Sequence, residues 1–286
     1  MKNPHLKHIA EINVAMLFIS TSGVLGRYIS MPPVITIWWR ALFAVLIVGV
    51  FCWYKKINFK VVNQKDWRTL LLSGVLFGGH WVTYFYSLQI SNVAIGLLSL
   101  FTYPVITALL EPLFFNSKLN LKHIFFGILI LIGIYFLIPE FNLENNHTKG
   151  ILWGLLSAVF YALRNILLKT KISNYNALTL MFYQLLTVVI ILSPSFFLVQ
   201  AVPTTNEWGA LIFLALVTTA IGHTLFVSSF KHFSIGSVSI LSSIQPIYGI
   251  LLGILFLSEI PSINTLIGGT IILATVVIES VQSKKK

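Results

Sequence analysis

The segments SLFTYPVITALLEPLFFNS (Ser99–Ser117) and LSSIQPIYGILLGILFLSE (Leu241–Glu259) share one unusual design. Each is an apolar run interrupted by a proline, with small hydroxyl residues before the proline and leucine and phenylalanine after it. Shifting the second segment back by 142 residues places Pro246 on Pro104. A proline inside a helix removes one backbone hydrogen bond and clashes with the preceding turn, so the repeated proline predicts a repeated break. The pair indicates an internal duplication.

The composition indicates an integral membrane protein. Of the 286 residues, 57% are hydrophobic and only 9% are charged, whereas a soluble domain carries roughly 25% charged residues. The formal net charge of +11 favours contact with a membrane surface over nucleic acid, because the basic residues lie in short gaps between apolar runs. The single cysteine, Cys52, excludes a disulfide scaffold and a cysteine-based metal site. We expect no cofactor and no metal.

Ten stretches are long and apolar enough to cross a bilayer, which takes about 20 residues. They are roughly Ile9–Ile29, Val34–Trp53, Thr69–Gln89, Val93–Phe115, Leu121–Pro139, Gly150–Lys169, Ala177–Leu198, Trp208–Phe230, Ile235–Leu257 and Ile263–Val281. The breaks between them are short and contain turn-forming residues. The sequence therefore predicts an all-α integral membrane protein with ten transmembrane helices.

The distribution of lysine and arginine predicts the orientation of these helices. If the N-terminus is cytoplasmic, fifteen of the nineteen basic residues fall on the cytoplasmic side. They are Lys2, Lys7, Lys55, Lys56, Lys60, Lys65, Arg68, Lys118, Lys122, Lys169, Lys171, Lys231, Lys284, Lys285 and Lys286. An excess of basic residues in cytoplasmic segments is the positive-inside pattern. Both the N-terminus and the C-terminus are therefore predicted to be cytoplasmic.

The duplication divides the ten spans into two five-helix units, residues 1–145 and residues 146–286. The shift that aligns the prolines also places Gly269 on Gly127. Because five is odd, the second unit is predicted to enter the membrane inverted relative to the first. Inverted repeats build many secondary transporters, whose substrate site lies near mid-membrane between the repeats. The alternative is that the two halves match by chance and not by duplication. Most matched positions are leucine or isoleucine, and apolar helices resemble one another by composition.

Three ordered motifs resemble a known family. The segments IWWRALFAVLI (residues 37–47), SLQISNVAIGLLSLFTYPVITALLEPLFF (residues 87–115) and SSIQPIYGILLGILFLSEIPSINTLIGGTIIL (residues 242–273) resemble those of the drug/metabolite transporter (DMT) superfamily, specifically its ten-helix EamA-type exporters. The resemblance covers essentially the whole chain. One departure is that Ser117 stands where the second copy has Glu259, although the family's first copy usually also ends in an acid.

The resemblance implies a multi-pass secondary transporter, commonly an exporter, of small metabolites such as amino acids, in the bacterial cytoplasmic (inner) membrane. We expect it to work by alternating access on a small-molecule substrate within the lipid bilayer. Transport is driven either by protons or by exchange against a counter-substrate. The oligomeric state is either a monomer or a homodimer. The alternatives are a membrane-embedded enzyme and a drug or nucleotide-sugar-type exchanger. An enzyme is disfavoured because Asp66 is the only aspartate and no HExxH motif is present.

Ionisable residues inside the spans are site candidates because such groups are costly in a membrane. Arg40 lies about two turns into the second span, where it either contacts a substrate carboxylate or packs against a neighbouring helix end. His80 and His223 lie near the middle of the third and eighth spans, each after a glycine. Histidine titrates near neutral pH, so these two either bind substrate or protons or form hydrogen bonds at a helix interface. Arg164 is expected to be an interface anchor near the cytoplasmic end.

Aromatic and uncharged polar side chains complete the predicted cavity wall. The candidates are Trp39, Trp81, Tyr84, Tyr103, Tyr161, Asn165 and Gln245. Pro104 and Pro246 are either hinges or static kinks. Small hydroxyl residues before each proline are placed to bond the carbonyls that the prolines free, since a membrane interior offers no water. These residues are Ser99, Thr102, Ser242 and Ser243.

Overall fold

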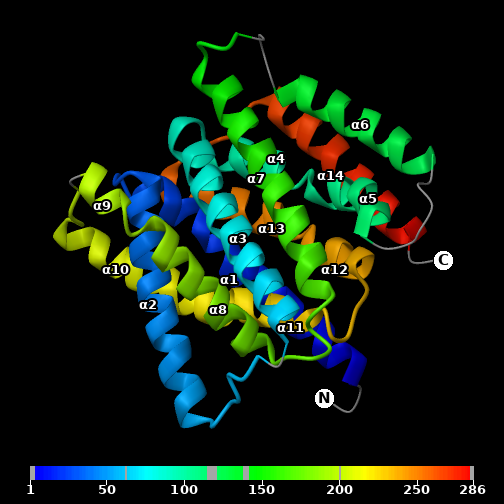
Figure 1. Cartoon of the computed structure of the whole chain (residues 1–286). Coiled ribbons are helices and arrows are strands. Elements are labelled where there is room, and N and C mark those ends of the chain that lie inside the picture. The colour runs from blue at the N-terminus through cyan, green and yellow to red at the C-terminus, as the bar shows by residue number, and fades with distance from the viewer. Residues whose placement is uncertain (1–3, 62, 115–120, 138–141, 200, 284–286) are drawn as a thin grey trace.

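The computed structural model describes residues 4–61, 63–114, 121–137, 142–199 and 201–283, and all regular secondary structure within these ranges is helical. The elements are α1 (Pro4–Tyr28), α2 (Pro33–Tyr54), α3 (Gln64–Ile90), α4 (Val93–Leu100), α5 (Tyr103–Phe114), α6 (Leu121–Leu137), α7 (Asn146–Lys169), α8 (Ala177–Leu192), α9 (Ser195–Leu198), α10 (Thr205–Phe213), the π-helix η1 (Leu214–His223), α11 (Thr224–Ser229), α12 (Ile235–Ser242), α13 (Gln245–Leu257) and α14 (Ile263–Ser283). Figure 1 shows them gathered into one bundle. The predicted all-α class is confirmed.

Seven helical stretches of the described chain are long and apolar enough to cross a membrane. They are His5–Tyr28, Pro33–Tyr54, Val93–Phe114, Asn146–Lys169, Ala177–Leu198, Thr205–Ser229 and Ile235–Leu257. Two shorter apolar helices, Ile124–Leu137 and Ile263–Ile278, lie within α6 and α14. These helices make the chain a multi-pass membrane protein, as the composition predicted.

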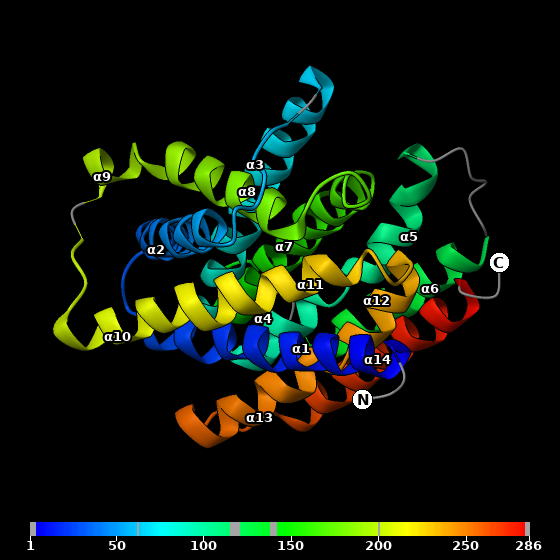
Figure 2. The same ribbon diagram turned by 90° about the horizontal axis from the view of Figure 1, so that it is seen from below.

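The helices run back and forth between two ends of the bundle. The start of α1 and the end of α14 lie at the same end, and α9 and α10 lie at the other (Figures 1 and 2). A large core cluster joins the buried apolar side chains of α1, α2, α3, α7, α8 and η1. A second, smaller cluster packs α6 against α14. The large cluster surrounds the segment of α3 that carries His80, so this segment lies at the centre of the fold.

The fourth and ninth predicted spans are each interrupted by a short break. One break separates α4 from α5 just before Pro104, and the other separates α12 from α13 just before Pro246. Three of the four hydroxyl residues next to the breaks donate to the carbonyl three residues back, and not to the carbonyls of Leu100 and Ser242 that the prolines free, so this prediction is wrong. Thr102 Oγ1 donates to the Ser99 carbonyl, Ser242 Oγ to the Ser239 carbonyl and Ser243 Oγ to the Ile240 carbonyl. The fourth, Ser99, has a buried hydroxyl with no hydrogen-bond partner in the described chain.

The breaks recur at the predicted spacing. α12, α13 and α14 each begin 142 residues after α4, α5 and α6. The N-caps recur as well: the Asn92 side chain accepts a hydrogen bond from the Ile95 backbone N–H at 2.8 Å, and the Ser234 side chain accepts one from the Ser237 N–H at 3.1 Å. Such caps satisfy backbone donors at the first turn of each helix.

A polar cluster joins loops at the end of the bundle that holds α9 and α10. The Glu259 carboxylate pairs with Arg27 Nε at 2.9 Å and accepts the Val93 backbone N–H at 2.8 Å. Arg27 also donates to the carbonyl of Gln89, and the Gln89 side-chain amide donates to the carbonyls of Ile29 and Met31. Glu259 thus links α1 and the loop after α13 to the first turn of α4.

At the opposite end, Asp66 holds the start of α3 to the chain after α7. Its two oxygens accept hydrogen bonds from Lys171 Nζ at 2.6 Å and from the Tyr175 hydroxyl at 2.7 Å. The bond from Lys171, followed by that from Tyr175, lowers the pKa of this carboxyl, which precedes the predicted span at Thr69. The ionised form is therefore the one that stabilises the fold.

Acidification should remove this stabilisation. Because the folded pKa lies below the ordinary aspartate value of about 3.9, the stability contributed by Asp66 is present above that value and is lost as the pH falls through the lowered pKa. We expect Asp66→Asn to cost roughly 1.5–3 kcal/mol at pH 7, the range for hydrogen bonds to a charged group. Melting curves of the purified protein between pH 7 and pH 3 measure both effects. Equal stability of the variant and the wild-type chain at pH 7 would contradict this role.

Candidate functional site

A buried polar cluster surrounds His80 at the middle of α3. The His80 Nδ1 lies 2.7 Å from Ser157 Oγ of α7, and the Ser157 hydroxyl donates to the His80 carbonyl at 2.9 Å. Because a serine hydroxyl has one proton, this geometry requires Nδ1–H to be the donor to Ser157. The Nε2 atom of the neutral ring is then an acceptor. The His80 ring stacks on Tyr161 with their centres 4.4 Å apart.

The two helix breaks meet beside this cluster. Tyr103, the first residue of α5, places its ring edge against Tyr161 at 4.8 Å between centres. The Tyr103 hydroxyl lies 2.7 Å from the hydroxyl of Ser242, the last residue of α12. One hydrogen bond therefore joins the break before Pro104 to the break before Pro246. All of these side chains are buried.

Two buried arginines enclose an aromatic pair on α3. The guanidinium carbon of Arg40 lies 4.0 Å from the centre of the Trp81 ring. Trp81 and Phe77, one turn apart on α3, have ring centres 3.9 Å apart. The guanidinium carbon of Arg164 lies 4.1 Å from the centre of Phe77. The four groups contact one another in the order cation, ring, ring and cation, with the two rings tilted by 41°, and the series crosses from α2 through α3 to α7.

The π-helix η1 packs against the same cluster and contributes Thr219 and His223 to it. A π-helical turn is wider than an α-helical turn and is frequent at functional sites. Here it lets the Thr219 hydroxyl donate to the Leu214 carbonyl five residues back, at 2.8 Å, and accept from Arg40 Nε at 2.7 Å. His223 ends η1 and sets its ring edge against Phe77 and Trp81, with centres 5.2 and 5.4 Å apart.

The site is rich in hydrogen-bond donors. Arg164 donates to the side-chain oxygens of Gln184 at 2.8 Å and Asn165 at 3.1 Å. The Gln184 side chain in turn donates to Ser73 Oγ at 2.8 Å. Several buried side-chain nitrogens nevertheless have no hydrogen-bond partner in the described chain. They are Arg40 Nη1 and Nη2, Arg164 Nε, Asn165 Nδ2 and His223 Nδ1.

The structure brings most of the predicted site residues together. His80, Tyr84, Tyr103 and Tyr161 form one aromatic group, and Arg40, Trp81 and His223 form the adjoining one with Phe77, while Asn165 joins through Arg164. Gln245 is buried beside the second break, where its backbone carbonyl accepts a hydrogen bond from Ser20 at 3.0 Å.

Trp39 lies in a different aromatic group. Its ring contacts Trp38, Phe43, Phe196 and Trp208, toward α9 and α10. Successive residues of a helix point about 100° apart, so the neighbour of Arg40 faces another part of the bundle.

The expectation that Arg164 is an interface anchor is wrong. Its side chain is fully buried and stacked on Phe77, whereas an anchor extends its charge to the membrane surface. A signal was available in the sequence, since Arg164 follows Tyr161 by three residues and so shares its helix face. Phe77 and Ser157, which complete the cluster, are residue types common in any apolar helix and gave no such signal.

In the described ranges, no group of three or more His, Cys, Asp or Glu side chains is placed to hold a metal ion.

Comparison with known proteins identifies the family. The EamA-like transporter family matches residues 9–138 and again residues 148–280. The chain belongs to this family, within the DMT superfamily. Both matches together span nearly all of the chain, so the EamA-type architecture accounts for the whole bundle rather than for a part of it.

Similar proteins are transporters by name. The uncharacterized transporter YxxF of Bacillus subtilis is 27% identical to this EamA-family chain and covers 97% of it, with 91% of YxxF aligned. An uncharacterized transporter of Archaeoglobus fulgidus is 28% identical, with 94% of both chains aligned. The pseudopaline exporter CntI of Pseudomonas aeruginosa is 25% identical over 71% of each chain. These names indicate a transporter rather than an enzyme.

A solved crystal structure shares the fold. It superposes with a TM-score of 0.72 over 97% of this chain and 99% of the other, at 16% sequence identity. At this level of identity the match shows the fold alone. It extends from the first helix to the last, so the EamA-family bundle described here is one that also occurs in a solved protein.

Proposed function

We propose that this EamA-family chain is a secondary transporter that exports small metabolites, such as amino acids, across the bacterial inner membrane by alternating access. The observation that carries the proposal is the hydrogen bond between Tyr103 and Ser242, which joins the breaks of both interrupted helices beside the buried His80 cluster. In secondary transporters, interrupted helices typically border the substrate site near mid-membrane. Export is the direction stated for CntI, a relative.

The architecture we propose is ten spans in two inverted five-helix units. The units are residues 1–145 and residues 146–286, each containing one of the two family matches. The seven apolar spans, together with α3, α6 and α14, supply the ten crossings. The recurrence of α4, α5 and α6 as α12, α13 and α14 supports the duplication. Both chain termini are then cytoplasmic, in agreement with the positive-inside pattern.

In this mechanism the site lies between the two units. His80 and Tyr103 belong to the first unit, and Ser157, Tyr161 and Ser242 belong to the second. Movement of one unit against the other therefore separates the partners of the hydrogen bonds described above. Pro104 and Pro246 stand at the breaks where α5 and α13 can change direction, and we assign them the role of hinges.

The cluster linked by Glu259 belongs to the outer face in this orientation. Opening outward requires α1, the loop after α13 and the start of α4 to move apart, so the ion pair between Arg27 and Glu259 must break in that state. An ion pair that is partly exposed costs little to break, since such pairs contribute roughly 0–1 kcal/mol. The ion pair can therefore hold the outer face closed and still break easily when the transporter opens outward.

Two driving forces for transport stay open, a proton gradient and exchange against a counter-substrate. His80 and His223 are titratable groups within the site, which favours protons as the driving ion. Exchange against a counter-substrate would use the same site and needs no titrating group. A flux that depends on a pH gradient selects the first, and a flux that depends on solute on the opposite side selects the second.

The test of the proposed function is transport by purified protein in liposomes. Vesicles loaded with amino acids, polyamines, nucleobases or carboxylates should release at least one class of solute with saturable kinetics. Vesicles without protein give the leak rate. Cleavage of a lipid or peptide without any solute flux would instead support the membrane-embedded enzyme. Release that never saturates would indicate a channel.

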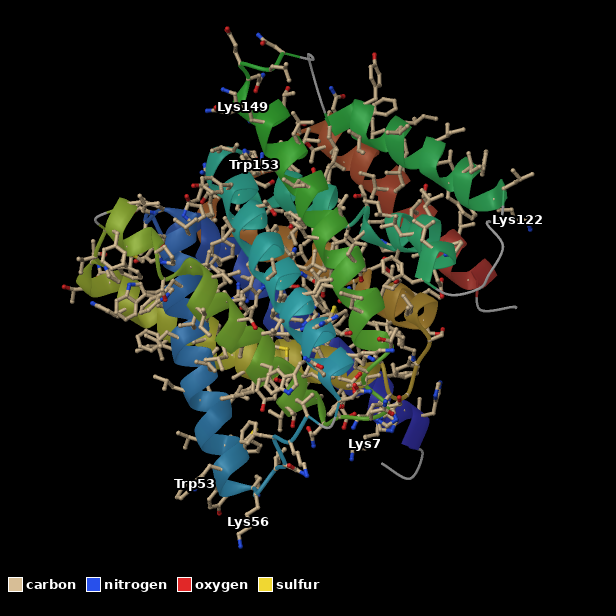
Figure 3. The ribbon with its side chains drawn as sticks, viewed as in Figure 1. Lys7, Trp53, Lys56, Lys122, Lys149 and Trp153 are labelled. Atoms are coloured by element: carbon tan, nitrogen blue, oxygen red, sulfur yellow. The ribbon has the colours of Figure 1, made fainter. Side chains whose placement is uncertain are left out.

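Cysteine labelling tests the proposed orientation. In a Cys52→Ala background, Lys56→Cys is expected to react with a membrane-impermeant maleimide only after the cells are opened. Lys149→Cys should react in intact cells, because Lys56 and Lys149 lie at opposite ends of the bundle (Figure 3). Labelling of both positions from the same side would overturn the orientation, and Lys7→Cys serves as a second cytoplasmic marker.

A further inference from the structure

Two arginines lie in the centre of the bundle, and neither has a carboxylate partner among the residues that the structure describes. Arg40 is 1% exposed and Arg164 is 0% exposed. Ion pairs within the described residues join Lys7 and His8 to Glu11, Arg27 to Glu259 and Lys171 to Asp66, and neither arginine takes part in them. A buried charge is strongly disfavoured unless it is paired and hydrogen-bonded.

The buried carboxylates of the described chain are engaged elsewhere. Asp66 bonds Lys171 and Tyr175 at one end of the bundle. Glu207 caps α10 and accepts hydrogen bonds from the Ser30 backbone N–H at 2.8 Å and the Ser30 hydroxyl at 3.0 Å. The centre therefore carries two positive charges that these acids do not neutralise.

Each of the two arginines keeps at least one N–H donor that no described residue bonds. Arg40 uses Nε for Thr219, so both terminal nitrogens of its fork are free of protein partners within the described chain. Arg164 uses its terminal nitrogens for Gln184 and Asn165, and its Nε is the free donor. A planar fork with two parallel N–H donors fits a carboxylate in a bidentate manner.

The spacing of the charges suits a molecule with two acidic groups. The series of Arg40, Trp81, Phe77 and Arg164 has steps of 4.0, 3.9 and 4.1 Å. The two guanidinium carbons are thus at most about 12 Å apart, since the direct distance cannot exceed the sum of the steps. The buried apolar rings of Trp81 and Phe77 lie between them. The His223 ring stands edge-on to both rings, and its Nδ1 has no hydrogen-bond partner in the described chain.

We propose that Arg40 and Arg164 bind the acidic groups of the transported molecule, and that the substrate class is small organic carboxylates, with two carboxylates preferred over one. This inference rests on the proposed transport function and names the substrate of the same site. The carboxylates reach the arginines when the two five-helix units separate. Arg40 binds one carboxylate through its fork, and Arg164 attracts the second.

The competing role is structural, because the two arginines also hold helices together through their stacks and bonds. The two roles differ in the effect of replacing arginine with methionine, which is similar in length and uncharged. An arginine kept for binding leaves an uncompensated charge in the core, so its removal preserves or raises the melting temperature while it lowers ligand affinity. An arginine kept for structure lowers the melting temperature on removal.

The first experiment compares ligands of one skeleton on the purified wild-type protein. Succinate, succinamate and succinamide carry two, one and no carboxylates, glutamate and glutamine form a second set, and butane-1,4-diamine is the cationic probe. A ligand that binds the folded state raises the melting temperature by mass action. We expect stabilisation in the order succinate, succinamate, succinamide, and glutamate above glutamine. If no carboxylate stabilises more than its amide, or the diamine stabilises most, the proposal is overturned.

The second experiment uses variants. Arg40→Met and Arg164→Met should each weaken succinate binding at least tenfold, while the melting temperature without ligand stays at or above that of the wild-type protein. Arg40→Lys keeps the charge without the fork and should recover part of the affinity. Arg68→Met, at an exposed position of α3, is the matched control and should bind as the wild-type protein does. Wild-type affinity in both core variants would overturn the assignment.

Flux in liposomes separates this proposal from the transport function. Saturable flux of neutral or cationic solutes with no preference for carboxylates would leave a transporter standing and would remove the carboxylate assignment. Selective carboxylate binding without flux of any solute would support the carboxylate assignment and would remove the proposed transport function.

Discussion

Replacing His80 with alanine is expected to lower the saturable solute flux of the reconstituted protein at least tenfold, which corresponds to about 1.4 kcal/mol. The ring stacks on Tyr161, and its Nδ1 bonds Ser157 across the interface between the two family matches. The substitution removes a hydrogen-bonding group from the proposed cavity and leaves the Ser157 hydroxyl with one partner fewer. Initial rates of solute release from liposomes, normalised to the amount of folded protein, measure the effect.

Two further variants make this result interpretable. His147→Ala is the matched control, because His147 is exposed in the first turn of α7 and should transport as the wild-type protein does. His80→Gln can still donate a hydrogen bond to Ser157 but cannot titrate, so it should fold even if the alanine variant does not. We expect His80→Gln to remain impaired. Wild-type flux in both His80 variants would remove this residue from the site.

The sequence was sufficient to predict the helical breaks because their cause is local. A proline lacks the N–H of other residues and fits best in the first turn of a helix, where Pro104 and Pro246 lie, so these two breaks could be predicted without any tertiary information. The rule is not absolute, since Pro112 lies inside α5. The partners of the hydroxyl groups beside them were not predicted correctly, because serine and threonine in a helix also bond carbonyls of their own preceding turn. Thr102, Ser242 and Ser243 each donate to the carbonyl three residues back, and not to the Leu100 and Ser242 carbonyls that the prolines free.

The arrangement of the site was only partly predictable because it depends on which helix faces meet. His80, Trp81 and Tyr84 share one helix, so their common environment followed from helical spacing. Trp39 lies in a different aromatic group from Arg40, because adjacency in sequence does not put two helical side chains on the same face. The π-helix that turns Thr219 toward Arg40 has no marker in the sequence that a periodicity argument detects.

Arg164 shows the limit most clearly. Its distance from the cytoplasmic end of the span favoured an anchor, but Phe77 and Gln184 from two other helices surround it. Contacts between helices far apart in sequence decide whether a basic residue reaches the surface or stays buried. Such contacts are the part of the structure that a single sequence does not display.

Adding one methyl group at Gly268 is expected to destabilise the fold strongly. Gly268 lies where α14 packs on α6, and a Cβ atom at this position would lie 2.5 Å from the backbone carbonyl oxygen of Gly133. It would also lie 3.1 Å from the Cβ of Phe136. A backbone oxygen cannot rotate away as a side chain can, so the two helices must separate. Small residues allow such close helix contacts in membranes, where packing rather than hydrophobic exclusion holds helices together.

We expect Gly268→Ala to cost about 1–3 kcal/mol, the usual range for overpacking a core, and Gly268→Leu to prevent α14 from docking. Gly209→Ala in α10 is the matched control, because a Cβ there meets nothing within 4 Å. Alanine is the better helix former by about 1 kcal/mol, so the control should be as stable as the wild-type protein or more stable. Thermal denaturation in detergent, followed by the loss of the monodisperse species, compares the three variants. If Gly268→Ala is as stable as Gly209→Ala, the contact between α6 and α14 is looser than the backbone geometry requires, and the second core cluster does not depend on it.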